Sequence, residues 1–333
     1  MSKGIVERLA DGPVLGDGGY LLELEKRGYV QAGPFTPEVV IEHPDALAQL
    51  HREFLRAGAE VLQTMTFYAS DDKLATVGMR GSVDEINRNA VRIAREIAAE
   101  GDALVAGNLS LTWAYDPDDP ASSDHVRGLF DRQLQDQIDA GPPDFWIGET
   151  FSYLGEALLF VERAKATGLP VMATMSFEKL PAASYEGDTP GRCAERLAEA
   201  GADIVGVNCL NGPAQQLPIA VAMVEAVGTS VPVAAQPVAY ATTDTAADFT
   251  STPAFPYGLS PITLARGDLA AFAADARDAG VRYIGSCCGS VAEHVRAMAK
   301  VLDKLPEPER EWRSESGKPM SAYEYYAHTE TET

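Results

Sequence analysis

The segment Arg282-Tyr-Ile-Gly-Ser-Cys-Cys-Gly289 is predicted to be a short buried strand that runs into a turn carrying two adjacent cysteines. A helical pattern precedes it over residues 269–279 and ends at Gly280, a residue type that commonly terminates helices. A helix, a glycine stop and an apolar strand, in this order, form the repeating unit of parallel α/β folds. The segment therefore predicts one such unit near the end of the chain.

The same unit recurs along the whole sequence. The predicted strands cover residues 14–19, 60–64, 103–108, 144–149, 170–175, 203–208, 231–236 and 283–287. The predicted helices cover residues 20–27, 36–56, 86–100, 124–140, 153–167, 189–200, 215–227 and 269–279. Strands this apolar are typical of a parallel sheet that is covered on both faces. Eight repeats over about 300 residues predict a closed (β/α)₈ barrel, the TIM-barrel architecture.

An open nucleotide-binding sheet is the competing α/β architecture. It would carry a glycine-rich phosphate loop after its first strand, and the segment Gly16-Asp-Gly-Gly19 lacks the required G-x-G-x-x-G spacing. Three extended connections follow predicted strands, over residues 66–84, 111–123 and 238–261. A barrel keeps its active-site loops at these positions. The last connection could act as a lid or be a plain insertion.

The domain organisation follows from composition. Residues 1–304 are predicted to form the barrel, and residues 305–333 form a short polar C-terminal tail with too few apolar residues for a core of its own. The tail is either an oligomerisation arm or partly disordered. Because it carries several aromatic residues that could dock on a neighbouring subunit, we expect a homo-oligomer.

The overall charge excludes several partners. The chain of 333 residues is 46% hydrophobic and carries a formal charge of −22, which would repel nucleic acid and anionic membrane surfaces. It contains no apolar run long enough to span a bilayer. With four cysteines and no apolar signal core at its N-terminus, the protein is expected in the reducing cytoplasm.

Three of the four cysteines follow predicted strands. Cys209 ends the strand Asp203-Ile-Val-Gly-Val-Asn-Cys209, while Cys287 and Cys288 follow the strand at Arg282. Three thiolates can hold a zinc ion and leave its fourth position open, as in catalytic zinc sites. Two other interpretations remain open at this point: cysteines are common as small core residues, and vicinal cysteines can form a redox disulfide.

Polar residues also gather at the predicted strand ends, which converge on one site in a barrel. The residues at these ends are Asp17, Gln63, Asn108, Glu149, Asn208, Cys209, Gln236, Cys287 and Cys288. Most strand ends would be expected to carry apolar or small residues, so this concentration of carboxylates, amides and thiols favours a zinc site with polar neighbours.

Several segments together carry a resemblance to a known family. They are Asp17-Gly-Gly-Tyr-Leu-Leu-Glu-Leu-Glu-Lys-Arg-Gly28, Leu50-His-Arg-Glu-Phe-Leu-Arg-Ala-Gly58, Gln63-Thr-Met-Thr-Phe-Tyr-Ala-Ser70, Gly206-Val-Asn-Cys209 and Gly285-Ser-Cys-Cys-Gly289. The chain resembles the homocysteine S-methyltransferases, and within them the betaine-dependent enzymes. The resemblance covers residues 4 to 303 and implies zinc-dependent transfer of a methyl group from an onium donor, such as glycine betaine or a related betaine, to the thiol of homocysteine.

The resemblance also implies roles for individual residues. It assigns zinc to Cys209, Cys287 and Cys288, with the homocysteine sulfur as fourth ligand. Asp17 and Glu149 are expected to bind the amino group of homocysteine and to serve as the catalytic carboxylates. The other expected substrate-binding residues are Gly18, Phe35, Gln63, Tyr68 and Gln236.

The identity of the donor stays open within this resemblance. Phe35 stands where the betaine enzymes have tryptophan, Met65 where the animal enzymes have another aromatic residue, and Thr150 where they have tyrosine. S-methylmethionine, proline betaine and dimethylsulfoniopropionate are therefore alternative donors. A non-catalytic zinc or redox-sensing barrel is the alternative from a different class of protein.

Overall fold

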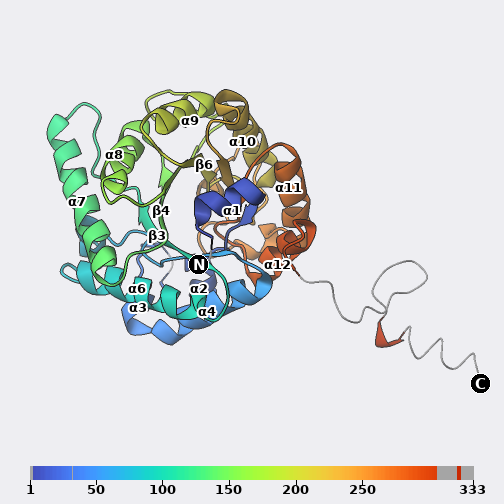
Figure 1. Ribbon diagram of the computed structural model, residues 1–333. Helices are drawn as coiled ribbons and strands as arrows, with labels where there is room; N and C mark the ends of the chain where they lie inside the picture. The colour runs from blue at the N-terminus through green and yellow to red at the C-terminus, as the bar shows by residue number, and fades with distance from the viewer. Residues whose placement is uncertain (1–2, 32, 306–320, 324–333) are drawn as a thin grey trace, which may run out of the picture.

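The computed structural model describes residues 3–31, 33–305 and 321–323, and its centre is a ring of eight parallel strands (Figure 1). The strands are β1 (Val14–Leu15), β2 (Val61–Gln63), β3 (Leu104–Ser110), β4 (Phe145–Phe151), β5 (Val171–Met175), β6 (Ile204–Asn208), β7 (Val233–Gln236) and β8 (Tyr283–Ile284). Each strand pairs with the next in the sequence from β2 to β8, and β8 pairs with β1. This order confirms the predicted (β/α)₈ barrel.

Strands β1 and β2 are the two ends of the strand order, and a single residue, Glu60, bridges the gap between them. The backbone N–H of Glu60 donates to the carbonyl of Leu15 at 2.9 Å, and the Glu60 carboxylate accepts from the Leu15 N–H at 2.9 Å. Lys304 pairs with the same carboxylate at 2.9 Å. The Glu60 side chain thus completes the ring where the regular strand ladder stops, and Lys304 is tied to that closure.

Helices surround the ring. They are α1 (Ile5–Asp11), α2 (Leu21–Lys26), α3 (Val39–Glu42), α4 (Pro44–Ala57), α5 (Asp71–Ala75), α6 (Val83–Ala98), α7 (Pro120–Asp139), α8 (Leu154–Lys165), α9 (Pro190–Glu199), α10 (Pro213–Val227), α11 (Arg266–Asp278) and α12 (Ala292–Val301). Gly58 ends α4 in the left-handed region, at φ 104°, which a residue with a side chain rarely adopts.

Several helix boundaries differ from the prediction. The single helix expected over residues 36–56 is wrong, because it is broken into α3 and α4 at Pro44. Proline has no N–H to donate and pushes the preceding residue out of helical geometry, and His43 is accordingly non-helical, at φ −142° and ψ 57°. Helix α7 begins at Pro120 rather than at residue 124, since the Asp119 side chain caps it by accepting from the Ala121 N–H. Helices α1, α5 and α12 were not predicted.

The interior of the barrel is packed with side chains. Val61, Phe145, Met172 and Tyr283 are buried there among other strand residues, which fill the ring as expected for eight strands. Helix α1 lies across the centre of the ring in Figure 1, and its Ile5 packs into the same cluster. The barrel interior is therefore covered at the end where the strands begin, and the carboxyl ends of the strands lie at the opposite end.

The connection over residues 238–261 folds back over that opposite end. The Asn211 amide donates to the carbonyls of Phe177 at 3.0 Å and Ala247 at 2.9 Å, and the Phe249 N–H donates to the Leu210 carbonyl at 3.0 Å. The connection contains two short 3-10 helices, Phe249–Ser251 and Ser260–Ile262. Its position over the strand ends agrees with an active-site loop, and movement as a lid stays a hypothesis.

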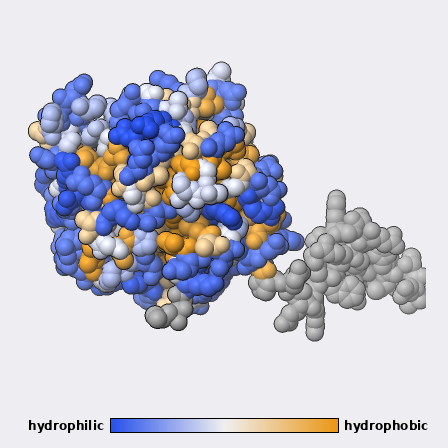
Figure 2. Space-filling view, turned by 45° about the horizontal axis from the view of Figure 1, so that its top comes forward, coloured by the Kyte–Doolittle hydropathy of each residue, from blue (hydrophilic) through white to orange (hydrophobic). Residues whose placement is uncertain are grey.

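The surface is largely hydrophilic in Figure 2, with hydrophobic residues showing nearer the middle of the face. In the described part of the chain, no helix is both long enough and apolar enough to cross a bilayer. The predicted tail falls mainly on residues 306–320 and 324–333, which lie outside the described residues.

Candidate active site

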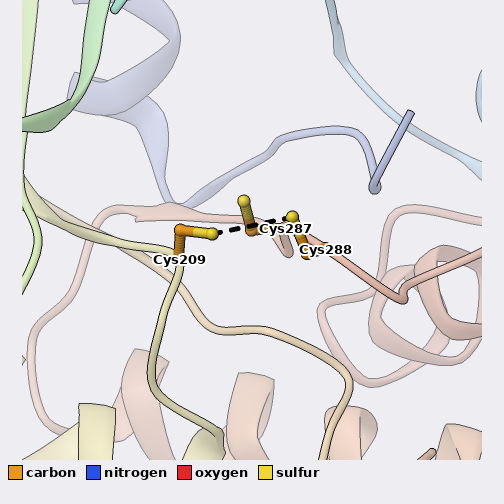
Figure 3. A group of neighbouring side chains, drawn as sticks. All are labelled: Cys209, Cys287 and Cys288. Carbon is orange, nitrogen blue, oxygen red and sulfur yellow. Dashed lines mark hydrogen bonds between the residues drawn. The ribbon is translucent and has the colours of Figure 1, made fainter. Parts of the chain in front are cut away.

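Three cysteines converge at the carboxyl ends of the strands. Cys209 follows β6, and Cys287 and Cys288 follow β8 (Figure 3). The three Sγ atoms all lie within 4.8 Å of one another, and those of Cys209 and Cys288 are 3.7 Å apart. All three thiols are free. Residues 79 positions apart in the sequence therefore form a single cluster of sulfur atoms.

The backbone around the cysteines is held in an unusual conformation. Cys209 has φ 56° and Leu210 has φ 52°, in the left-handed region that non-glycine residues rarely occupy. The Cys209 N–H donates to the Gln236 carbonyl at 2.9 Å, and the Cys287 N–H donates to the Pro237 carbonyl at 2.8 Å. These bonds join the two cysteine loops through the end of β7. Strained backbone of this kind is concentrated at functional sites in proteins.

A glycine allows the first loop to approach the cysteines. A Cβ atom on Gly19 would lie 2.6 Å from the Cys287 carbonyl oxygen, a distance that real Cβ atoms do not tolerate. Gly19 therefore lets the turn after β1 pack directly against the Cys287-Cys288 loop. This contact brings the neighbouring Asp17 to the same end of the barrel.

The donor set of the cluster fits a zinc ion. Thiolates are soft ligands that select zinc, and three of them leave one tetrahedral position for a substrate. Three thiolates this close would repel one another without a cation between them. The described residues hold no other group of three or more histidine, cysteine or acidic ligand atoms as close together as these.

Glu149 in β4 is a buried carboxylate with three amide donors. Gln63 and Asn108 each donate to Oε1 at 2.7 Å, and Asn208 donates to Oε2 at 3.1 Å. Burial raises its pKa to about 8, and the charge of Cys209 adds to the shift, while the amide hydrogen bonds act in the opposite direction. The carboxylate is thus rigidly oriented and has no cationic partner among the described residues.

Asp17 lies at the end of β1 and is 2% exposed. Its Oδ2 accepts hydrogen bonds from the Gln63 N–H at 2.7 Å and from the Tyr20 hydroxyl. Burial raises the pKa of Asp17 to about 6, and these two donors limit the shift. Within the described parts of the chain neither Asp17 nor Glu149 is paired with a base, and two such buried carboxylates near one cavity are suited to bind a cationic group.

One cavity of about 140 Å³ brings all the predicted site residues together. Its walls include the ten predicted residues, Asp17, Gly18, Phe35, Gln63, Tyr68, Glu149, Cys209, Gln236, Cys287 and Cys288. The buried Oε1 of Gln236 has no hydrogen-bond partner, which leaves it available to a ligand. The Gln63 side chain is committed to Glu149 instead, so its direct effect is to orient that carboxylate.

Sequence reasoning missed several residues of the site. Tyr20 and Phe249 line the cavity, and His51 lies behind it, 3.1 Å from the Tyr20 hydroxyl. His51 is fully buried, and its ring packs against that of Tyr20. Tyr20 follows the Asp-Gly-Gly turn directly, which is a usable signal. Phe249 comes from a long loop whose path no local pattern predicts.

Comparison with known sequences identifies relatives of this chain. The homocysteine S-methyltransferase family model matches residues 14–302. The chain is 47% identical over 311 residues to betaine–homocysteine S-methyltransferase 1 of Bos taurus, covering 91% of this chain and 75% of that protein. It is 43% identical to S-methylmethionine–homocysteine S-methyltransferase BHMT2 of Pongo abelii, covering 90% of this chain and 81% of that one.

A solved structure shares the fold. The metallated form of the homocysteine methyltransferase MmuM from Escherichia coli superimposes with a TM-score of 0.70 at 21% identity, covering 89% of this chain and 99% of that one. The family match and the relatives define an enzyme of the methyltransferase class, built on a barrel with a cysteine cluster. The chain belongs to the homocysteine S-methyltransferase family.

Proposed function

We propose that this enzyme transfers a methyl group from a small onium donor, glycine betaine or a related betaine, to the thiol of homocysteine, and that it requires zinc. The product is methionine. The observation that carries the proposal is the cluster of three thiols on the wall of a cavity that also contains two buried carboxylates. Family membership supports the same reaction.

Cys209, Cys287 and Cys288 would hold the zinc ion. When bound, the ion lowers the pKa of a coordinated substrate thiol, so that the sulfur is a thiolate at neutral pH. The chain's own contribution is to fix three sulfur atoms on short loops at the strand ends and to leave the cavity side of the cluster free. In the transfer, a carbon–sulfur bond to homocysteine forms as the bond from the methyl group to the donor's onium atom breaks. The electron pair of the broken bond stays on the donor.

Asp17 and Glu149 would bind the amino group of homocysteine. Both are buried acceptors without a cationic partner in the described residues, and an ammonium supplies the missing charge. The amides of Gln63, Asn108 and Asn208 hold Glu149 in one orientation. Binding of the ammonium would also lower the raised pKa of Glu149 and keep that carboxylate ionised.

Aromatic side chains would receive the onium head of the donor. Such a cation cannot donate a conventional hydrogen bond and is recognised by the faces of aromatic rings. Phe35 and Phe249 line the cavity, and Phe255 packs against both of their rings at 5.8 Å. Tyr68 belongs to the same wall, as the sequence resemblance implies, and contributes its hydroxyl and ring edge.

S-methylmethionine is the second candidate donor. The observation that favours it is the similarity to the S-methylmethionine-dependent relative, which is nearly as high as the similarity to the betaine-dependent ones. Proline betaine and dimethylsulfoniopropionate have the same kind of methylated cation. We further propose a cytoplasmic homo-oligomer that binds neither nucleic acid nor membranes, in keeping with its charge of −22.

The test is a donor panel. Zinc-loaded enzyme is incubated with homocysteine and each of the four donors in turn, and methionine is measured directly by mass spectrometry. We expect methionine with at least one donor, and none with the Cys288→Ala protein. Absence of methionine with every donor, from protein that holds zinc, would contradict the proposed reaction.

A further inference from the structure

Lys73 in α5 places its ammonium over two aromatic rings next to the cavity. Its Nζ lies 4.5 Å from the ring centre of Tyr68 and 4.9 Å from that of Trp113. The Trp113 Nε1–H donates to the Tyr68 hydroxyl at 2.9 Å, which joins the two rings. Since Tyr68 is part of the cavity wall, the three residues form one unit behind that wall, with a positive charge in it.

This unit leaves no free face on Tyr68. The Phe67 ring centre is 4.2 Å from that of Tyr68, with the planes tilted by 35°, so Phe67 covers one face. Lys73 lies over the ring at a similar distance, and two groups cannot occupy the same face. Lys73 therefore covers the other face. A donor cation at Tyr68 meets only the edge and hydroxyl of the ring, with a lysine charge close behind it.

The charge of Lys73 has no counterpart in the cavity wall. Among the described residues, no lysine, arginine or histidine lines the cavity, and no ion pair involves Lys73. Burial lowers the pKa of Lys73 to about 8, and the nearby carboxyls of Glu156 and Asp72 act in the opposite direction. Lys73 is thus mainly protonated at neutral pH and half-buried, where its charge is only partly screened.

The candidate donors share a second group besides the methylated cation, namely a carboxylate. The methyl group must point at the sulfur cluster for transfer, so the carboxylate points away from Cys209 and Cys288. The described residues that line the cavity are acidic, neutral polar or apolar, and none of them is basic. We infer that Lys73 is a specificity-determining residue that favours onium donors carrying a carboxylate and disfavours onium cations that lack one. This inference rests on the proposed function and deepens it.

Lys73 can discriminate between donors because its charge acts differently on a simple monocation and on a zwitterion. Asp17, Glu149 and the three thiols make the cavity attractive to any small cation, so attraction alone cannot select a donor. A fixed positive charge near the Tyr68 wall repels a simple monocation, whereas a zwitterion compensates that repulsion through its carboxylate. Selectivity of this kind needs a repulsive element as well as an attractive one. Lys73 supplies the repulsive element, and the rings of Tyr68 and Trp113 hold its ammonium in place.

The test compares two ligands that differ in the carboxylate, glycine betaine and tetramethylammonium. Their binding to zinc-loaded enzyme is measured by titration calorimetry in the presence of methionine, which occupies the acceptor site and has no free thiol to accept a methyl group. Lys73→Met keeps the length of the side chain and removes the charge, Lys73→Arg keeps the charge, and Lys300→Met removes an exposed charge from α12 as the matched control.

For wild-type enzyme we expect glycine betaine to bind more tightly than tetramethylammonium. Lys73→Met should weaken glycine betaine binding by roughly fivefold, the loss expected when a nearby unit charge that does not touch the ligand is removed, and should not weaken tetramethylammonium binding. Lys73→Arg and Lys300→Met should keep the wild-type preference. A merely structural role for Lys73 would weaken both ligands alike, and that result would overturn the inference. So would an unchanged preference in Lys73→Met.

Failure of the inference differs from failure of the proposed function. If methionine is formed from glycine betaine and the preference does not depend on Lys73, the reaction stands and the inference falls. If the two ligands are discriminated through Lys73 while no donor yields methionine, the inference about binding stands and the proposed reaction falls.

Discussion

The hydroxyl oxygen of Tyr20 lies 3.1 Å from Nδ1 of His51, deep behind the cavity. Tyr20 has a single hydroxyl proton and donates it to the Asp17 carboxylate. His51 must therefore carry its proton on Nδ1 and donate to Tyr20. The three residues form a chain of hydrogen bonds that ends on Oδ2 of Asp17 and leaves the other carboxylate oxygen for a ligand.

These hydrogen bonds predict that His51 positions Asp17 without touching a substrate. His51→Leu should raise the KM for homocysteine by roughly five- to tenfold, the loss expected from one hydrogen bond of about 1 kcal/mol, with little change in the donor KM. His51→Asn places an amide N–H where Nδ1 stands and should restore most of the loss. Steady-state kinetics check both variants. Equal losses in His51→Leu and His51→Asn would show a packing role instead.

The burial of His51 also predicts how the stability of the protein depends on pH. Burial lowers its pKa to about 3 in the folded protein, against an ordinary value of 6.5, so between these values the unfolded chain binds the extra proton. The contribution of His51 to the free energy of unfolding has its full value above pH 6.5. Between pH 6.5 and pH 3 this contribution decreases by about 1.4 kcal/mol for each unit that the pH falls.

Asp17 acts in the opposite direction over part of that range. Its pKa is raised to about 6, so the folded protein binds that proton more readily, and stability from Asp17 falls as pH rises from 3.8 to 6. Urea unfolding of the zinc-free protein across pH 4 to 7 separates the contributions of His51 and Asp17. His51→Asn should remove the decrease in stability that His51 causes at acidic pH and should leave the contribution of Asp17 in place. An unaltered pH profile in His51→Asn would contradict the assignment.

Zinc binding is predicted to depend on three cysteines and not on the fourth. Cys209→Ala, Cys287→Ala and Cys288→Ala should each lose the metal and the activity, because two thiolates cannot complete the site. Cys193 is buried in α9 away from the cluster and gives the matched control. Metal content measured by mass spectrometry should be about one zinc per chain in wild type and Cys193→Ala. Full zinc occupancy in Cys288→Ala would refute the ligand set.

Glu149→Gln should weaken homocysteine binding and leave zinc in place. The change removes the charge opposite the substrate ammonium, which is worth about 1.5–3 kcal/mol, or roughly ten- to a hundredfold in KM. Kinetics with homocysteine as the varied substrate measure the effect, and metal analysis verifies the site. Glu225→Gln on the exposed side of α10 is the control. An unchanged homocysteine KM in Glu149→Gln would show that this carboxylate is structural.

The sequence alone determined the architecture and the chemical content of the site. Apolar runs that alternate with helical patterns, and glycines such as Gly58 at helix ends, specify local backbone geometry, and local geometry repeated eight times leaves a barrel as the fitting solution. The ten predicted site residues all reached one cavity because strand ends converge in such a barrel. Prediction went wrong within residues 36–56, where Pro44 breaks a pattern that is otherwise helical.

Only the tertiary structure decided which groups meet. The stagger of the strands aims three amides at the single carboxylate of Glu149, and an irregular turn at Cys209 brings its sulfur to 3.7 Å from that of Cys288. The two rings that Lys73 contacts, Tyr68 and Trp113, belong to two separate loops, after β2 and after β3. A local pattern gives the direction of a side chain relative to its own strand or helix. Contacts between distant segments depend on how strands register and loops pack, which no single segment encodes.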